Sequence, residues 1–198
     1  QEEMAEDISL MAAVQPSDDS YFGTSVFNHA KHRILWLLFL MLSATITGTI
    51  ISRYEETISA IPLLVSFIPM LMDTGGNCGT QSSTLVIRGI ATDEIRFTDL
   101  FKVAFKESRI ALIVGAALAV VNGLRIIVMY QDPRLAILLG ISLMCTVFLA
   151  ELIGCLLPLL AKKVHLDPAI MAAPLITTIV DTCSIIIYFA IATHLFAL

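Results

Sequence analysis

The sequence predicts an all-α membrane protein with five transmembrane helices per chain. Of its 198 residues, 57% are hydrophobic and 15% are charged, and the mean hydropathy is +0.86, whereas soluble domains carry about 25% charged residues. Long stretches are free of charge, and Ile34 to Ser52 is one of 19 residues. About 20 such residues cross a hydrocarbon core of about 30 Å. The four cysteines lie in apolar segments, where they act as small hydrophobes rather than as disulfide or metal ligands.

The amino-terminal stretch differs from the rest of the chain in its charge. Six of the seventeen acidic residues fall in the first nineteen positions, and Pro16 interrupts a short helical pattern there. We therefore predict a cytosolic leader at residues 1–30 and one five-helix membrane domain at residues 31–198.

Five apolar segments follow, and the second is unusual. The predicted spans are residues 33–53, 57–88, 102–129, 134–161 and 168–196. The second is long for a simple helix and holds Pro62, Pro69 and three glycines. A broken or strongly tilted helix is expected there, and irregular backbone at membrane depth needs protein or a water-filled cavity around it.

The basic residues predict the orientation in a cell membrane. Nine of the twelve Lys and Arg residues flank the amino end and the loops after spans two and four, and three lie on the other side. Because cytoplasmic loops are enriched in Lys and Arg, the amino terminus should be cytoplasmic and the carboxyl terminus outside. Residues 91–109 alternate phenylalanines with charges and should form an amphipathic segment at the interface.

Three acidic residues within the predicted spans are candidates for function: Asp73, Glu151 and Asp181. A charge at the bilayer centre costs roughly 2.5–3.5 kcal/mol on insertion scales, so such residues are rare. The structural alternative is a protonated or hydrogen-bonded acid between helices. This alternative is favoured for Glu151, whose nearest polar companion in sequence is Thr146, and disfavoured for Asp181.

Asp181 belongs to a polar strip on an apolar helix. Helical spacing aligns it with Thr177, Thr178 and Ser184, and Pro174 one turn earlier should free carbonyl oxygens by removing a backbone donor. Carboxylate, hydroxyl and carbonyl oxygens suit hard cations such as Mg²⁺.

Asp73 has a comparable setting in PMLMDTGGNCGTQSSTLVIRG, residues 69–89. Asn77, Gln81 and several hydroxyls follow it, and the glycines Gly75, Gly76 and Gly79 let the backbone approach another helix or an ion.

Together this stretch and DPAIMAAPLITTIVDTCSIIIYF, residues 167–189, resemble the signature segments of the MgtE family of magnesium channels. The resemblance implies a two-fold homodimer in the lipid bilayer, with a pore at the interface lined by spans two and five. It implies Mg²⁺ as the transported ion, held by Asp181 with oxygens of Thr177 and of Ala173, the last through its carbonyl alone. The pore-lining residues it implies are Asp73, Gly75, Gly76, Asn77, Gly79, Gln81, Pro174, Thr178 and Ser184.

The resemblance also implies cytosolic regulatory domains, an amino-terminal domain and paired CBS domains, which this sequence does not contain. Residues 1–30 resemble the end of the helix that connects that region to the pore.

The function predicted from this resemblance is a magnesium-selective channel that passes hydrated Mg²⁺ down its electrochemical gradient. An ion-coupled divalent cation transporter is one alternative. A second is an intramembrane aspartyl protease in which Asp73, within a DTG tripeptide, pairs with Asp181. No enzymatic activity and no nucleic-acid partner are expected.

Overall fold

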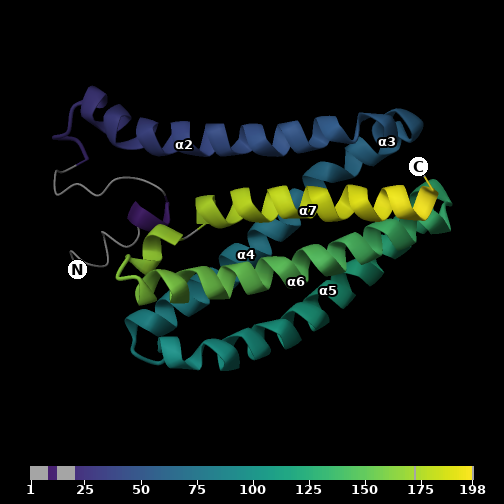
Figure 1. The fold of residues 1–198 in the computed structure, drawn as a ribbon. Coiled ribbons are helices and arrows are strands. Elements are labelled where there is room, and N and C mark those ends of the chain that lie inside the picture. Colours follow the sequence, from purple (N-terminus) through teal and green to yellow (C-terminus); the bar gives the residue numbers. More distant parts are fainter. Residues whose placement is uncertain (1–8, 13–20, 172, 198) are drawn as a thin grey trace.

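The computed structural model describes residues 9–12, 21–171 and 173–197, and these contain helices and no strand. Of the predicted leader, residues 1–8 and 13–20 lie outside the described part. Figure 1 shows long helices running side by side, crossed by one oblique helix. The elements in chain order are α2 (Val26–Arg53), α3 (Glu55–Ala60), η1 (Pro62–Phe67), α4 (Ile68–Ala91), η2 (Phe97–Asp99), α5 (Leu100–Tyr130), α6 (Pro133–Lys163), η3 (Pro168–Met171) and α7 (Ala173–Phe196).

The helical class is confirmed, and the number of spans is confirmed in part. Among the described residues, four helices are long and apolar enough to cross a membrane: α2, α5 with η2, α6 and α7. Helix α4 has 24 residues but is not one of the four, because amide, hydroxyl and carboxylate side chains are spread along it. Its role as a fifth span remains a prediction.

The predicted break in the second segment is confirmed at Pro62. Helix α3 ends at Ala60, the 3₁₀ turn η1 follows, and α4 starts at Ile68 with Pro69 in its first turn. Proline is accepted in a first turn because the backbone N–H that it lacks has no intrahelical partner there.

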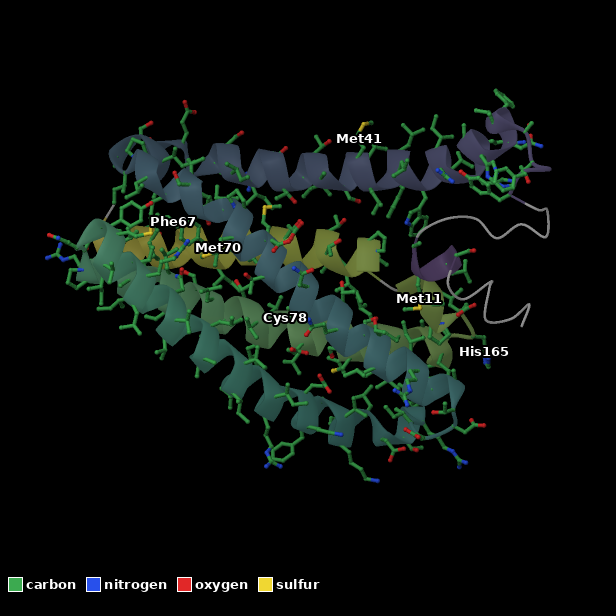
Figure 2. The ribbon with its side chains drawn as sticks, turned by 180° about the vertical axis from the view of Figure 1, so that it is seen from behind. Met11, Met41, Phe67, Met70, Cys78 and His165 are labelled. Atoms are coloured by element: carbon green, nitrogen blue, oxygen red, sulfur yellow. The ribbon has the colours of Figure 1, made fainter. Side chains whose placement is uncertain are left out.

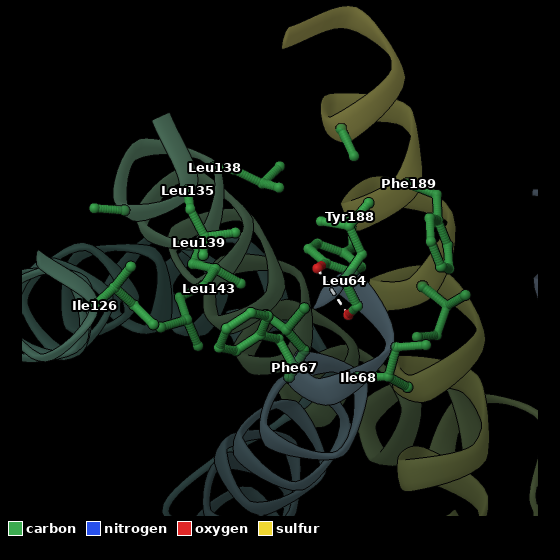
Figure 3. Close-up of a cluster of buried hydrophobic side chains, with 14 residues drawn as sticks. Leu64, Phe67, Ile68, Ile126, Leu135, Leu138, Leu139, Leu143, Tyr188 and Phe189 are labelled. Carbon is green, nitrogen blue, oxygen red and sulfur yellow. Dashed lines mark hydrogen bonds between the residues drawn. The ribbon is translucent and has the colours of Figure 1, made fainter. Parts of the chain in front are cut away.

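A cluster of buried hydrophobic side chains fixes this broken segment against α7. Leu64 and Phe67 of η1 pack with Tyr188 and Phe189 of α7, as Figure 3 shows. The Tyr188 hydroxyl donates a 3.0 Å hydrogen bond to the Leu64 carbonyl. Buried carbonyls outside regular helix need such donors, so the tyrosine satisfies the irregular backbone where the helix breaks.

The α5–α6 connection is a two-residue turn. Gln131 ends α5 in the left-handed conformation, with φ of 52°. Asp132 then caps α6 by accepting hydrogen bonds from the backbone N–H groups of Arg134 and Leu135, and Pro133 occupies the first turn. The two helices are thereby held antiparallel.

Connections gather at two opposite ends of the bundle. The α2–α3 region, the α5–α6 turn and the carboxyl end lie together in Figure 1, and the start of α2, the α4–α5 connection and the start of α7 lie at the other end. The nine and three basic residues therefore belong to opposite ends, and the side on which each end lies remains a prediction.

Helix α4 crosses α6 and α7 diagonally, which Figure 2 shows from behind with Met70 and Cys78 labelled on α4. By contrast, α2 packs mainly against α7, where the hydroxyls of Thr47 and Thr182 are 2.7 Å apart. Most of the α2 surface is exposed in the single chain.

Candidate functional site

A polar pocket lies between α4 and α7. Its volume is about 210 Å³, and a cavity needs only about 10–15 Å³ to admit one water, so several waters can enter it. Its lining comprises Met72, Asp73, Gly76, Asn77, Thr177 and Asp181.

Asp181 lies half-buried in the wall of this pocket. Its Oδ1 atom is buried and has no hydrogen-bond partner among the described residues. A buried carboxylate oxygen without a partner costs free energy. Any donor or cation that reached this oxygen would recover part of that cost.

The α4 side of the pocket continues as an exposed polar stripe. Asp73, Asn77 and Gln81 are at least partly exposed in the single chain. Since they follow at intervals of four residues, they share one face of the helix. Asp73 and Asn77 border the pocket, and Gln81 extends the same face beyond it.

The glycines of α4 lie on the side that packs against the other helices. A Cβ atom on Gly75 would come 2.7 Å from the Thr146 side chain, and one on Gly79 would come 2.7 Å from Ile176. At Gly76 it would lie 2.9 Å from the Thr177 side chain. The structure thus places Gly76 at the pocket, and Gly75 and Gly79 in the contact between helices.

The four residues of the predicted polar strip on α7 lie in different surroundings. Thr177 and Asp181 face the pocket. Thr178 accepts a hydrogen bond at its carbonyl from Thr182, whose hydroxyl meets α2. Ser184 is fully buried, and its hydroxyl oxygen would lie 3.4 Å from a Cβ atom added to Gly75. The pocket therefore brings together two of the four residues.

Pro174 lies at the start of a helix rather than within one continuous span of residues 168–196, and the freeing of carbonyl oxygens before it stays a prediction. Pro174 is the second residue of α7, which begins at Ala173 after the separate turn η3. Its own carbonyl accepts the hydroxyls of Thr177, at 3.0 Å, and Thr178, at 2.9 Å. Proline fits the first helical turn without loss of a bond. The segment that was predicted as one span therefore holds two separate elements, η3 and α7.

A second polar group, missed by the sequence analysis, lies between α4, α5 and α6. Glu107 and Glu151 are 6% and 4% exposed, so both glutamates are buried. The Ser82 hydroxyl meets the Glu107 carboxylate at 2.9 Å and the Glu151 carbonyl at 3.1 Å. Ser82 therefore links the two glutamates, whereas the Thr146 oxygen has no partner among the described residues.

Glu107 falls within the predicted interfacial segment, where Lys106 and Arg109 flank it. The spacing of the residues that follow indicates that this side of the helix is buried. Glu107, Ala111 and Gly115 recur every four residues and are all buried on α5. Phe101 and Phe105 are exposed, at 83% and 67%. The amphipathic pattern therefore has its aromatic residues outside and its glutamate inside.

The described residues contain no group of three or more His, Cys, Asp or Glu side chains that could hold a metal ion. The pocket offers two carboxylates, from Asp73 and Asp181. An ion bound there by one chain would need water, or groups from another chain, for its remaining ligands.

Comparison with known proteins gives a consistent result. Residues 68–191 match the MgtE family, described as a divalent cation transporter. The chain is 34% identical over 192 residues to the magnesium transporter MgtE of Thermus thermophilus and 34% identical over 191 residues to that of Bacillus subtilis. The Enterococcus faecalis magnesium transporter MgtE is 31% identical over 192 residues. These alignments cover 96–97% of this chain and 42% of each relative, so the chain spans less than half of their length.

Proposed function

Because the chain belongs to the MgtE family of divalent cation transporters, we propose that it forms the pore of a magnesium transporter passing hydrated Mg²⁺ down its electrochemical gradient. The observation that carries the proposal is the pocket between α4 and α7. Asp73, Asn77, Thr177 and Asp181 contribute only oxygen and amide groups to it, and the Oδ1 atom of Asp181 lacks a partner among the described residues.

The chemistry of Mg²⁺ fits a pocket of this kind. The ion gives up water reluctantly and usually keeps several waters when bound. A pathway for it should therefore contact the hydration shell, through carboxylates and amides that accept from or donate to the water ligands. A site with room for several waters and two carboxylates meets this requirement better than a tight cage.

A second copy of the chain would complete the pathway. The stripe of Asp73, Asn77 and Gln81 is accessible in the single chain, and an aspartate facing hydrocarbon at the bilayer centre costs roughly 2.5–3.5 kcal/mol. Two copies with these stripes facing each other across a two-fold axis would enclose water and place two Asp181 carboxylates near one axis. Their mutual repulsion favours a divalent over a monovalent cation.

The orientation proposed for this pore is the one that the basic residues predict. The chain is a multi-pass membrane protein, with four strongly apolar helices among the described residues. We place the end with nine basic residues in the cytoplasm. The longer relatives support further segments in the whole protein, and we propose that cytosolic regulatory domains are among them.

The test compares Asp181→Asn with Glu151→Gln in a Mg²⁺-uptake assay at matched expression. Asparagine keeps the size of the side chain and removes the charge, so uptake should fall at least about tenfold if one charge-assisted contact to the hydrated ion is lost. Glu151→Gln should leave uptake largely intact, because Glu151 is buried away from the pocket. Wild-type uptake by Asp181→Asn would refute the assignment of the central site.

An ion-coupled transporter is the second candidate, and the buried Glu107–Glu151 pair favours it. Membrane-embedded carboxyl groups commonly mark proton or cation relays. In liposomes, a pore passes Mg²⁺ along its gradient without a coupling ion, whereas a coupled carrier stops when a proton or Na⁺ gradient is removed. Glu107→Gln and Glu151→Gln should then abolish uptake.

The protease alternative is excluded, because the family consists of transporters.

A further inference from the structure

A second cleft lies where α4 packs against α5 and α6, away from α7. It has a volume of about 190 Å³ and is bordered by residues of α4, α5 and α6. Its apolar walls include Met70, Leu118 and Val121, and its polar groups are Thr74, Asn122 and Arg125. None of these residues belongs to the proposed ion pathway.

Two of the residues that border this cleft carry hydrogen-bond donors. Arg125 Nη2 donates to Asn122 Oδ1 at 2.8 Å and lies 3.4 Å from Met70 Sδ. Because the amide oxygen faces the guanidinium group, the orientation of the Asn122 amide is fixed. Its Nδ2 is left as a buried donor without a partner among the described residues, and Asn122 is only 7% exposed. A cationic donor and an unused neutral donor next to each other are complementary to an anionic oxygen group.

The cleft opens on a surface that is suited to hydrocarbon. Val121 is 67% exposed, Leu124 61% and Val128 78%, and all three are on α5 beside the two polar residues. Arg125 is itself exposed. In a membrane-spanning chain, this arrangement places a positive group among side chains that contact lipid.

The depth of Arg125 agrees with a lipid headgroup. Helix α5 has 31 residues, which gives a length of roughly 46 Å, and Arg125 is about 7.5 Å from its end at 1.5 Å per residue. If α5 is centred in the bilayer, Arg125 lies about 16 Å from the midplane, next to the boundary of a hydrocarbon core about 30 Å thick. Phospholipid phosphates lie just beyond this boundary.

We propose that this cleft binds a phospholipid molecule. Its phosphate oxygens accept hydrogen bonds from the Arg125 guanidinium group and the Asn122 Nδ2 atom, and an acyl chain lies along Leu118 and Val121. The lipid would thereby connect α4 to α5, one helix layer away from the ion pathway.

The experiment measures lipid retention by native mass spectrometry on the full-length protein with added phosphatidylglycerol. Arg125→Gln should weaken binding about tenfold, because a charge-assisted hydrogen bond is lost. Arg134→Gln is the matched control, since Arg134 is an exposed arginine at the same end of the bundle that does not border the cleft. Equal losses in the two variants, or none in Arg125→Gln, would overturn the proposal.

Two further arms identify the chemical group that is recognised. Diacylglycerol, which has the acyl chains without the phosphate, should bind at least about tenfold more weakly than phosphatidylglycerol. Millimolar inorganic phosphate should not displace the lipid, because it lacks the acyl contact, and displacement would overturn the assignment to a lipid. Asn122→Asp replaces the unused donor with an acceptor and should also weaken binding, and its melting temperature shows whether the variant is folded. Wild-type lipid binding by a folded Asn122→Asp protein would remove Asn122 from the site.

Discussion

At the scale of single residues, the acidic side chains Asp181 and Glu107 differ in their surroundings and in how well the sequence predicts them. Asp181 could be predicted as a site residue because hydroxyls recur at helical spacing around it. The spacing of Glu107 with Ala111 and Gly115 indicates a buried side of the helix, but the surroundings of Glu107 include Ser82 and Glu151, which lie 25 and 44 positions away. The sequence alone does not show that these three residues lie close together in the folded chain.

Ser82→Ala should destabilise the protein through the loss of one hydroxyl. That hydroxyl reaches both the Glu107 carboxylate and the Glu151 carbonyl in a buried place, and leaving buried acceptors without a donor costs about 1–3 kcal/mol. Thermal unfolding in detergent would measure the effect. Ser108→Ala is the matched control, because the Ser108 hydroxyl bonds only to the Ala104 carbonyl of its own helix, and it should change stability by less than about 0.5 kcal/mol. Equal stability of the two variants would show that the buried group contributes little.

At the scale of elements, the prolines predict the structure correctly in one segment and incorrectly in another. The break before α4 follows from Pro62 and Pro69 together, since two prolines and several glycines disfavour one continuous helix. In the last segment, Pro174 has the same local signature, but the chain ends the turn η3 before it and uses it to start α7. A proline does not by itself decide the outcome, since Pro158 lies inside the continuous helix α6, and whether a helix breaks, begins or continues at a proline depends on packing.

The crossing of α4 and α6 depends on a glycine pair. A Cβ atom on Gly154 would collide with the backbone carbonyl of Gly79, and no side-chain movement relieves a backbone collision. Gly154→Ala should therefore cost about 1–3 kcal/mol, the range for overpacked contacts.

Gly123→Ala is the control for helix propensity. Gly123 lies within α5, and a Cβ atom added to it would meet nothing within 4 Å. Alanine there should be neutral or stabilising by up to about 1 kcal/mol, because glycine loses more backbone entropy in a helix. Melting temperatures measured side by side test the contrast, and a stable Gly154→Ala protein would argue against the close α4–α6 contact.

At the scale of the whole molecule, the sequence predicts the helical class and the family. It does not predict which polar or small residues border the pocket and which lie in the contacts between helices. Composition and uncharged runs suffice for a membrane protein, because the bilayer imposes length and apolarity on each helix. Gly75 and Gly76 are adjacent in sequence, yet only Gly76 borders the pocket. A rotation of about 100° around a helix separates such neighbours, and only packing shows which side faces the pathway.

The final prediction concerns the surface that a second copy should cover. In a variant without the four native cysteines, Asn77→Cys should form an intermolecular disulfide under mild oxidation in lipid, because Asn77 is exposed on the face of α4 that we place at the two-fold axis. Leu124→Cys provides the contrast, since Leu124 is 61% exposed but lies on α5 among apolar side chains. It should form no cross-link, and a fluorophore attached to its thiol should be quenched by spin labels on acyl chains. The dimer proposal requires both results, because a water-filled interface brings two copies together at position 77 and keeps a fluorophore attached there away from the acyl chains. Quenching of a fluorophore attached at position 77 by acyl-chain spin labels, without a cross-link, would mean that α4 faces lipid and that the pathway is built in some other way.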